Sequence, residues 1–137
     1  YMMGQYQRSL EDSNEALRLK PDFAAAYFNR AIVYDGLGQY QLAISDYNET
    51  IRLTSDYVNA YNNRGVAYAK LNEFKPAIED FNHVIKLQPD LEQAYESRGI
   101  VYLSQGNKKS GCADARKACD LGNCELWQFV KNHGLCR

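Results

Sequence analysis

The residues best suited to chemistry are the four cysteines near the C-terminal end of the chain: Cys112, Cys119, Cys124 and Cys136. Cysteine side chains can form disulfides, bind zinc as thiolates, or fill a core as small apolar groups. Cys112 and Cys119 share a helix-like segment, where seven residues place their Cα atoms roughly 10.5 Å apart. Because a disulfide requires Cα atoms within about 7 Å, these two cysteines cannot pair with each other in an intact helix.

The segment after Asn123 indicates how the cysteines could pair instead. Leu126, Phe129 and Val130 share one face of a predicted final helix that ends at Gly134. If this helix folds back antiparallel, it nests the pairs, with Cys119 near Cys124 and Cys112 near Cys136. We expect two disulfides that pin a terminal cap, and hence an exported or periplasmic protein in an oxidising compartment.

Two other interpretations of the cysteines remain open. Reduced thiols could fill the core, which would suit a cytoplasmic protein. A four-thiolate zinc site is the other alternative, but the chain lacks the C-x₂-C pairs typical of such sites, because six, four and eleven residues separate its cysteines. We therefore expect no bound metal, and the thiol-based redox or metal protein is the least favoured class.

The rest of the chain offers little for catalysis or for charged partners. His83 and His133 are the two histidines, and neither has a nucleophile or carboxylate at a spacing typical of a catalytic site. Glycine-rich phosphate loops are absent. Sixteen basic and seventeen acidic residues are well mixed, which leaves no basic field for nucleic acid, and no apolar run is long enough to span a bilayer. We expect no enzymatic activity, no cofactor, no nucleic-acid partner and no membrane insertion.

The elements that must position the cysteines repeat every 34 residues. The repeating positions are Tyr27, Tyr61 and Tyr95; Arg30, Arg64 and Arg98; Tyr34, Tyr68 and Tyr102; and Asp46, Asp80 and Asp114. Each copy has apolar residues at helical spacing in two segments, which predicts a pair of amphipathic helices. We expect a single all-α domain over 1–137, with a partial repeat at 1–22, full repeats at 23–56, 57–90 and 91–123, and a capping helix and tail at 124–137.

Three further patterns support a helical hairpin in each repeat. Gly38, Asn72 and Gly106 tolerate the left-handed conformation that ends a helix. Aspartates stand just before each predicted first helix and are expected to be its N-caps: Asp22, Asp56 and Asp90. Arg30 lies eight residues before Gly38 and Asp46 eight after it, so antiparallel helices would bring them level. We interpret each such pair as a tie between helices; a row of arginines for an anionic ligand is the alternative.

A 34-residue helix–turn–helix with these signature positions resembles the tetratricopeptide repeat. In the first full copy the signature falls on Tyr27, Ala31, Tyr34, Gly38, Tyr40 and Ala43. The third copy departs from it, with Lys108 in place of the aromatic and Gly111 in place of the alanine. The resemblance implies a right-handed α-solenoid whose concave groove binds peptides or partner proteins.

In the resembled family, one stripe of the first helices lines that groove. Here we expect the groove to be formed by Phe28, Ile32, Asn59, Asn62, Val66, Lys70, Glu96, Ile100 and Leu103. Such a surface would favour an apolar segment whose backbone is held by amides. The alternative is that the apolar members pack against neighbouring first helices. The stripe lacks the lysine, asparagine and arginine clamp with which some family members hold a carboxylate terminus.

The predicted half repeat at the start of the chain offers a second surface. Asp12 has no arginine at the matching position, so we expect a fragment of a longer array or a lost beginning. Apolar residues of this segment would be open to self-association or swapping if no preceding helix covers them: Tyr6, Leu10, Leu17 and Leu19. An oligomerisation module is therefore the alternative to a peptide-binding scaffold.

Overall fold

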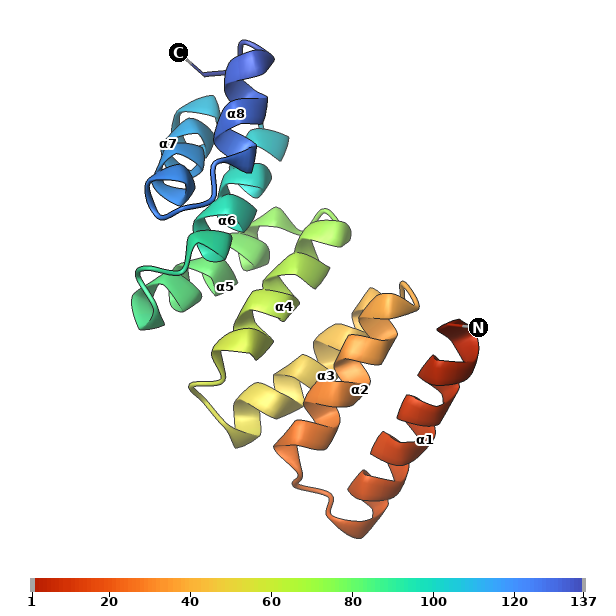
Figure 1. Cartoon of the computed structure of the whole chain (residues 1–137). Helices are drawn as coiled ribbons and strands as arrows, with labels where there is room; N and C mark the ends of the chain where they lie inside the picture. The colour runs from red at the N-terminus through yellow and green to blue at the C-terminus, as the bar shows by residue number, and fades with distance from the viewer. Residues whose placement is uncertain (1, 137) are drawn as a thin grey trace. The chain divides into compact units, whose positions relative to one another are not determined.

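The computed structural model describes residues 2–136, which form eight α-helices and no strand (Figure 1). The helices are α1 (Met2–Leu19), α2 (Ala24–Gly36), α3 (Tyr40–Leu53), α4 (Val58–Lys70), α5 (Phe74–Leu87), α6 (Glu92–Ser104), α7 (Lys108–Asp120) and α8 (Glu125–Asn132). The chain divides into two compact units, one extending to Leu71 with α1–α4 and one beginning at Asn72 with α5–α8. The division falls inside the second predicted repeat, between its two helices.

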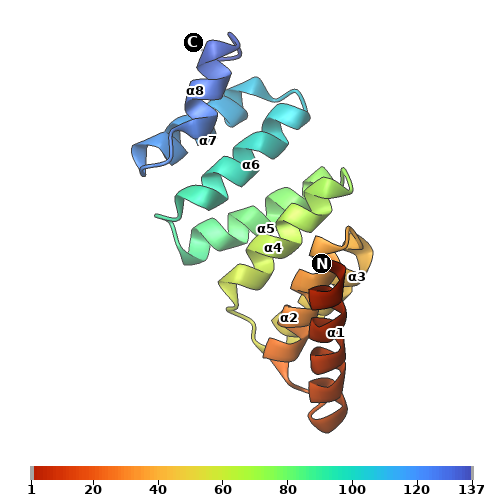
Figure 2. The same ribbon diagram turned by 45° about the vertical axis from the view of Figure 1, so that its right-hand side comes forward.

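Each unit contains one complete hairpin of the predicted kind, α2–α3 in the first and α6–α7 in the second (Figures 1 and 2). In both hairpins a glycine with positive φ ends the first helix, Gly38 at 75° and Gly106 at 81°. The next backbone amide then reaches back over the helix end, so Gln39 N donates to Tyr34 O at 2.8 Å and Asn107 N to Tyr102 O at 2.8 Å. This closing pattern satisfies carbonyls that the helix would otherwise leave open.

The third turn residue of this kind is also confirmed. Asn72 has φ 59°, and it is the one non-glycine residue with positive φ among residues 2–136. Asparagine tolerates this region better than most side chains because its short polar group can bond locally.

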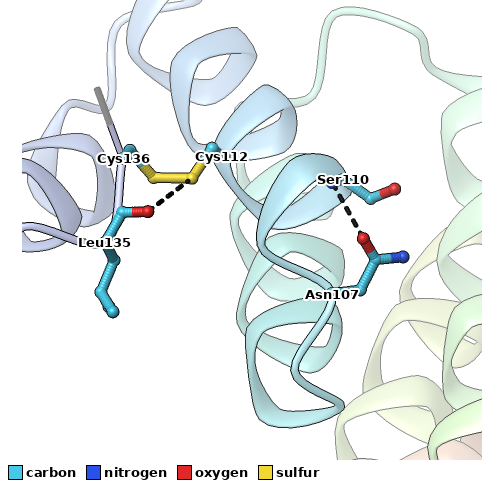
Figure 3. Close-up of a disulfide and its surroundings, with 5 residues drawn as sticks. All are labelled: Asn107, Ser110, Cys112, Leu135 and Cys136. Atoms are coloured by element: carbon cyan, nitrogen blue, oxygen red, sulfur yellow. Dashed lines mark hydrogen bonds between the residues drawn. A yellow bond between two sulfur atoms is a disulfide. The ribbon is translucent and has the colours of Figure 1, made fainter.

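The prediction that aspartates cap the first helices is wrong. The N-cap residues are Phe23, Tyr57 and Leu91, and none of them makes a side-chain hydrogen bond to its helix. Asp22, Asp56 and Asp90 lie one residue earlier, inside the turn, and are exposed. In the turn that precedes α7, Asn107 is a true cap: Ser110 N donates to its Oδ1 at 3.2 Å (Figure 3).

The core of the first unit forms around one buried aromatic ring. Tyr47 of α3 is fully buried among Ala31, Ala43 and Ala60, which come from α2, α3 and α4. Small side chains on three helices leave room for the ring, and Phe28 packs against its edge. This is the apolar face that the helical spacing predicts.

The arginine–aspartate ties are confirmed within both units. Arg30 donates to Asp46 through Nε at 2.7 Å and through a terminal nitrogen at 2.8 Å, and Arg98 makes the same paired contact with Asp114 at 2.8 and 2.7 Å. Both carboxylates are buried, and the hydrogen bonds they accept raise the pKa of each arginine above its usual value. Paired contacts of this geometry are among the stronger polar interactions in proteins.

Each arginine also donates to an asparagine, a partner that the sequence analysis missed. One nitrogen of each guanidinium donates to an asparagine of the preceding second helix, at 2.9 Å for Arg30 to Asn14 and 2.7 Å for Arg98 to Asn82. Arg64 reaches Asn48 in the same way at 2.8 Å. Each arginine therefore links neighbouring repeats, and its donors are engaged within the fold. This arrangement favours the structural interpretation over a row of arginines for an anionic ligand.

Candidate functional site

The four cysteines meet in the pairs that the antiparallel return of the last helix suggests. Cys112 is bonded to Cys136, with Cα atoms 5.8 Å apart, and Cys119 is bonded to Cys124 across the turn between α7 and α8. The sulfur of Cys112 lies 3.6 Å from the carbonyl oxygen of Leu135, which precedes Cys136 (Figure 3). One disulfide thus closes each end of α8. Sulfurs joined in this way are not available as thiolate ligands.

The last helix is seated where α7 lacks a large side chain. Its buried residues Leu126 and Val130 pack against Ala115, with the half-buried Leu103 and Trp127 around them. Ala115 stands at the repeat position that Tyr47 holds in α3 and Phe81 holds in α5, both fully buried. The terminal repeat therefore receives its core from α8 rather than from its own second helix.

Two glycines bring α6 and α7 into close approach beneath this cap. A Cβ placed on Gly111 would lie 2.6 Å from both Cγ and Cδ2 of Leu103, and one placed on Gly99 would lie 3.0 Å from Asp114 Cβ and 3.2 Å from Leu126 Cδ2. Gly111 departs from the alanine of the other repeats because Leu103 fills that space. In the second repeat, Ala69 stands at the position of Leu103, and Ala77 stands at the position of Gly111.

The turn that leads into α8 is held from the first helix of its own repeat. Asn123 donates through Nδ2 to the carboxylate of Glu96 at 2.6 Å. Glu96, which the sequence places in the groove, is half-buried and is engaged in this contact. Glu96 of α6 therefore helps to hold the turn that leads into α8.

The structure sorts the other predicted groove residues by exposure. Ile32 and Ile100 are 44% and 48% exposed. Asn59 and Lys70 are also exposed, and Val66 is half-buried. Phe28 packs on the rings of Tyr47 and Tyr57, with the second centroid 4.8 Å away. Asn62 is buried, and Leu103 packs against the core beneath α8. The six predicted residues up to Lys70 lie in the first unit and the other three in the second.

A polar contact joins α2 to α3 one turn beyond Ile32, between the half-buried Asp35 of α2 and the buried Tyr47 of α3. The hydroxyl of Tyr47 donates to Oδ2 of Asp35 in a short hydrogen bond. Burial raises the pKa of Asp35 above its usual value, and the hydroxyl offsets part of that rise. Within residues 2–136, the other carboxylate oxygen is buried without a hydrogen-bond partner, as is Oδ1 of Asn62.

In the part of the chain that the structure describes, no three His, Cys, Asp or Glu side chains are grouped so as to hold a metal ion. None of the described helices combines the length and the apolar character that a membrane span requires. His133 stacks on Phe129 of α8, with ring centroids 4.1 Å apart, and has no grouped catalytic partner there.

Solved structures of similar fold cover most of the chain. A crystal structure of MamA matches with TM-score 0.82 and 25% identity, over 87% of this chain and 70% of that one. MamA from Desulfovibrio magneticus RS-1 matches with TM-score 0.82 and 22% identity, over 87% and 67%. The first TPR of Spaghetti (RPAP3), solved with the HSP90 peptide SRMEEVD, matches with TM-score 0.75 and 22% identity, over 80% and 88%. The chain thus spans about two thirds of the MamA chains it matches.

Sequence comparison points to the same fold. No protein with a curated description matches the chain in sequence. Three family profiles match consecutive stretches: a tetratricopeptide repeat at residues 12–45, a TPR repeat at 36–72 and a tetratricopeptide repeat at 58–91. Together with the helical hairpins and the 34-residue period, these matches show that the chain is an all-α solenoid protein of the tetratricopeptide repeat family.

Proposed function

We propose that this chain is a non-catalytic scaffold that binds an extended, partly apolar segment of a partner protein on its first-helix face. The first-helix face is defined for each unit by itself, as the exposed surface of α2 and α4 in the first unit and, separately, that of α6 in the second. The observation that carries the proposal is the exposure of Ile32 and Ile100, 44% and 48%, at the same repeat position. Single exposed apolar side chains are common on protein surfaces, so it is the recurrence of isoleucine at one repeat position that supports a binding surface.

The neighbouring polar groups suit a peptide backbone. Asn59 and Lys70 are exposed on α4, where an amide and an ammonium group can bond to main-chain atoms of a ligand. A repeat domain of this fold holds a peptide in its solved structure, so such a role is within reach of the fold. The stripe here has no matching carboxylate clamp, and we expect apolar side chains of the ligand to contribute most of the affinity.

A displayed library of random peptides tests this proposal against the full, disulfide-bonded chain. We expect enrichment of peptides with aliphatic residues, and at least about tenfold weaker binding of these peptides by Ile32→Glu or Ile100→Glu. Leu42→Glu is the matched control, because Leu42 is 48% exposed but lies on the second helix α3. Circular dichroism checks that each variant stays folded. Equal loss with the control, or no enrichment, would contradict the proposal.

Self-association through α1 is the second candidate function. Leu19 and Met3 of this helix are 70% and 68% exposed, the highest values among the large apolar residues described. Tyr6, Leu10 and Leu17 are half-buried instead. Sedimentation velocity over a wide concentration range separates the two functions: an oligomerisation module would show a rising mean mass that Leu19→Lys abolishes, whereas a peptide-binding scaffold would stay monomeric.

We also propose that the chain works in an oxidising compartment, such as the periplasm or an exported space. The two disulfides support this, because cytosolic thiols are normally kept reduced. A non-reducing peptide map of freshly alkylated protein from its native cells tests it. Peptides joining Cys112 to Cys136 and Cys119 to Cys124 are expected, and four alkylated cysteines would place the chain in a reducing compartment.

A further inference from the structure

The third full repeat differs from the first two full repeats in having no large core residue on its second helix. Tyr47 and Phe81 are fully buried at one repeat position, and α7 has Ala115 there. The other α7 residues that face inward are equally small, with Ala118 fully buried and Cys112 half-buried. The large apolar side chains that cover Ala115 therefore come from α8, through Leu126 and Val130, and this part of the core of the hairpin α6–α7 depends on α8 being in place.

Helix α8, which supplies Leu126 and Val130, is too short to be stable on its own. Glu125–Asn132 has eight residues, and helices of this length are not stable in water without tertiary contacts. Its two ends are fixed covalently, since Cys124 is its N-cap residue and Cys136 follows four residues after its last turn. The packing of the repeat thus depends on α8, and the position of α8 depends on two S–S bonds.

We propose that α7 and α8 form a redox-dependent folding unit. In the oxidised chain they are folded, and reduction by a dithiol releases α8 and opens the third repeat while the first unit, which contains no cysteine, stays folded. The inference is independent of the first-helix face and of any partner. It makes the C-terminal end of the scaffold responsive to the thiol reductants of its surroundings.

The two bonds are expected to be reduced in order. Cys119 and Cys124 are both half-buried at the turn, whereas the other bond joins the half-buried Cys112 to Cys136, which is 7% exposed and packs in the core beneath α8. The Cys119–Cys124 bond therefore presents two partly accessible sulfurs and the Cys112–Cys136 bond only one. A thiolate of the dithiol attacks one sulfur of the Cys119–Cys124 pair, which breaks the S–S bond and forms a mixed disulfide. The second thiol closes the reductant into its own disulfide, and the released cysteine thiolate takes up a proton. Each bond consumes two electrons and two protons.

Once the first bond is open, the second still holds the end of α8. Cys112–Cys136 joins residues 24 apart in sequence, against five for Cys119–Cys124, so it restricts far more of the unfolded chain. We therefore assign the retention of α8 to Cys112–Cys136. Loss of the Cys119–Cys124 bond alone should leave the cap seated.

The single tryptophan of the chain, Trp127, lies on α8 and reports its release. The test treats the full chain with dithiothreitol and follows Trp127 emission, cysteine alkylation by mass spectrometry, and amide hydrogen exchange. We expect a red-shifted emission and about tenfold or faster exchange over 108–136, with less than about twofold change over 24–70. Alkylation should label Cys119 and Cys124 before Cys112 and Cys136.

Two paired variants separate the roles of the bonds. Cys119→Ser with Cys124→Ser should keep the emission and protection of the oxidised chain until dithiothreitol is added. Cys112→Ser with Cys136→Ser should resemble the reduced chain without any reductant. The proposal is overturned if the fully reduced wild-type chain keeps its α8 protection, if the first unit opens together with α8, or if the Cys119–Cys124 variant already behaves as reduced.

Discussion

Asp35 combines partial burial with incomplete hydrogen bonding, which makes its carboxylate costly to ionise. One of its oxygens accepts from Tyr47, and the other is buried without a partner within the described chain. Burial, the larger effect, raises its pKa, and the same surroundings raise the pKa of the Tyr47 hydroxyl. The folded state therefore holds the Asp35 proton more tightly than the unfolded state does.

We predict that Asp35→Asn stabilises the chain at neutral pH by about 1 kcal/mol, because it removes a buried charge and keeps an acceptor for Tyr47. The sign follows from linkage: a raised folded pKa makes stability fall as the pH rises from the unfolded value through the folded one. The gain should be absent below about pH 4, where wild-type Asp35 is protonated in both states. Urea unfolding at several pH values measures it.

Asp22→Asn is the control for this prediction, since Asp22 lies exposed in the turn before α2. It should leave the pH profile of unfolding unchanged. A stabilisation by Asp35→Asn that is equally large at low pH would show that ionisation of Asp35 has no part in the effect.

At the scale of helices, the contact between α6 and α7 depends on an exchange of side-chain volume. Leu103 on α6 fills the space beside Gly111 of α7, whereas the second helices of the other repeats have an alanine at the position of Gly111, Ala43 on α3 and Ala77 on α5. The second repeat has alanines at both of these positions, Ala69 and Ala77.

We predict that Gly111→Ala destabilises the oxidised chain by about 1–2 kcal/mol, because overpacking against Leu103 outweighs the better helix propensity of alanine. Leu103→Ala alone should cost about 2–3 kcal/mol through the cavity it leaves. The double variant reproduces the alanine pair of the second repeat. Its cost should be smaller than the sum of the single costs by about 1 kcal/mol.

Thermal and urea unfolding of the four chains completes this double-mutant cycle. Additive costs would show that Leu103 and Gly111 do not share the space between α6 and α7. Gly38→Ala tests a glycine of another kind and should not couple to Leu103, since Gly38 has open space around it and a φ of 75°.

The helices and ties were predictable from sequence because their signals are periodic. Arg30 and Asp46 each recur every 34 residues at equal distances from a turn residue, which predicts hairpins, and Gly38, Asn72 and Gly106 mark their turns. The asparagines that bind the arginines carry the same spacing at Asn14, Asn48 and Asn82, so that signal was present and unused. The capping aspartates were misplaced because a cap depends on where a turn ends, and a shift of one residue is beyond what spacing resolves.

At the scale of the whole molecule, the sequence predicts the contacts that recur in every repeat but not the packing that occurs only once. An antiparallel return of the last helix was enough to predict which cysteines pair. The structure adds the reason for that return: α8 packs on Ala115, an alanine at the position where the other full repeats have the buried Tyr47 and Phe81. The exposure of Ile32 and Ile100 and the partial burial of Phe28 depend on neighbours that one stripe of residues does not reveal. The first-helix face therefore remains a prediction at the level of its individual residues.

The division into two units leads to a prediction about unfolding. Repeat arrays are stabilised by interactions between neighbours, so distant parts can unfold separately. Both disulfides lie in the second unit, and together they contribute several kcal/mol there, about 3 for the longer loop and about 2 for the shorter. We expect Trp127 emission to report a urea midpoint about 1 M or more above the midpoint of the far-ultraviolet helix signal.

Reduction should reverse that order, because α8 then detaches before the helices of the first unit unfold. Urea titrations followed by both probes, with and without dithiothreitol, measure the two midpoints on the same sample. Coincident curves in the oxidised chain would mean that it unfolds in a single cooperative step, and that the disulfides stabilise both units together. Separate curves whose order does not change on reduction would instead place the stability of the second unit in its helix packing rather than in its sulfur bonds.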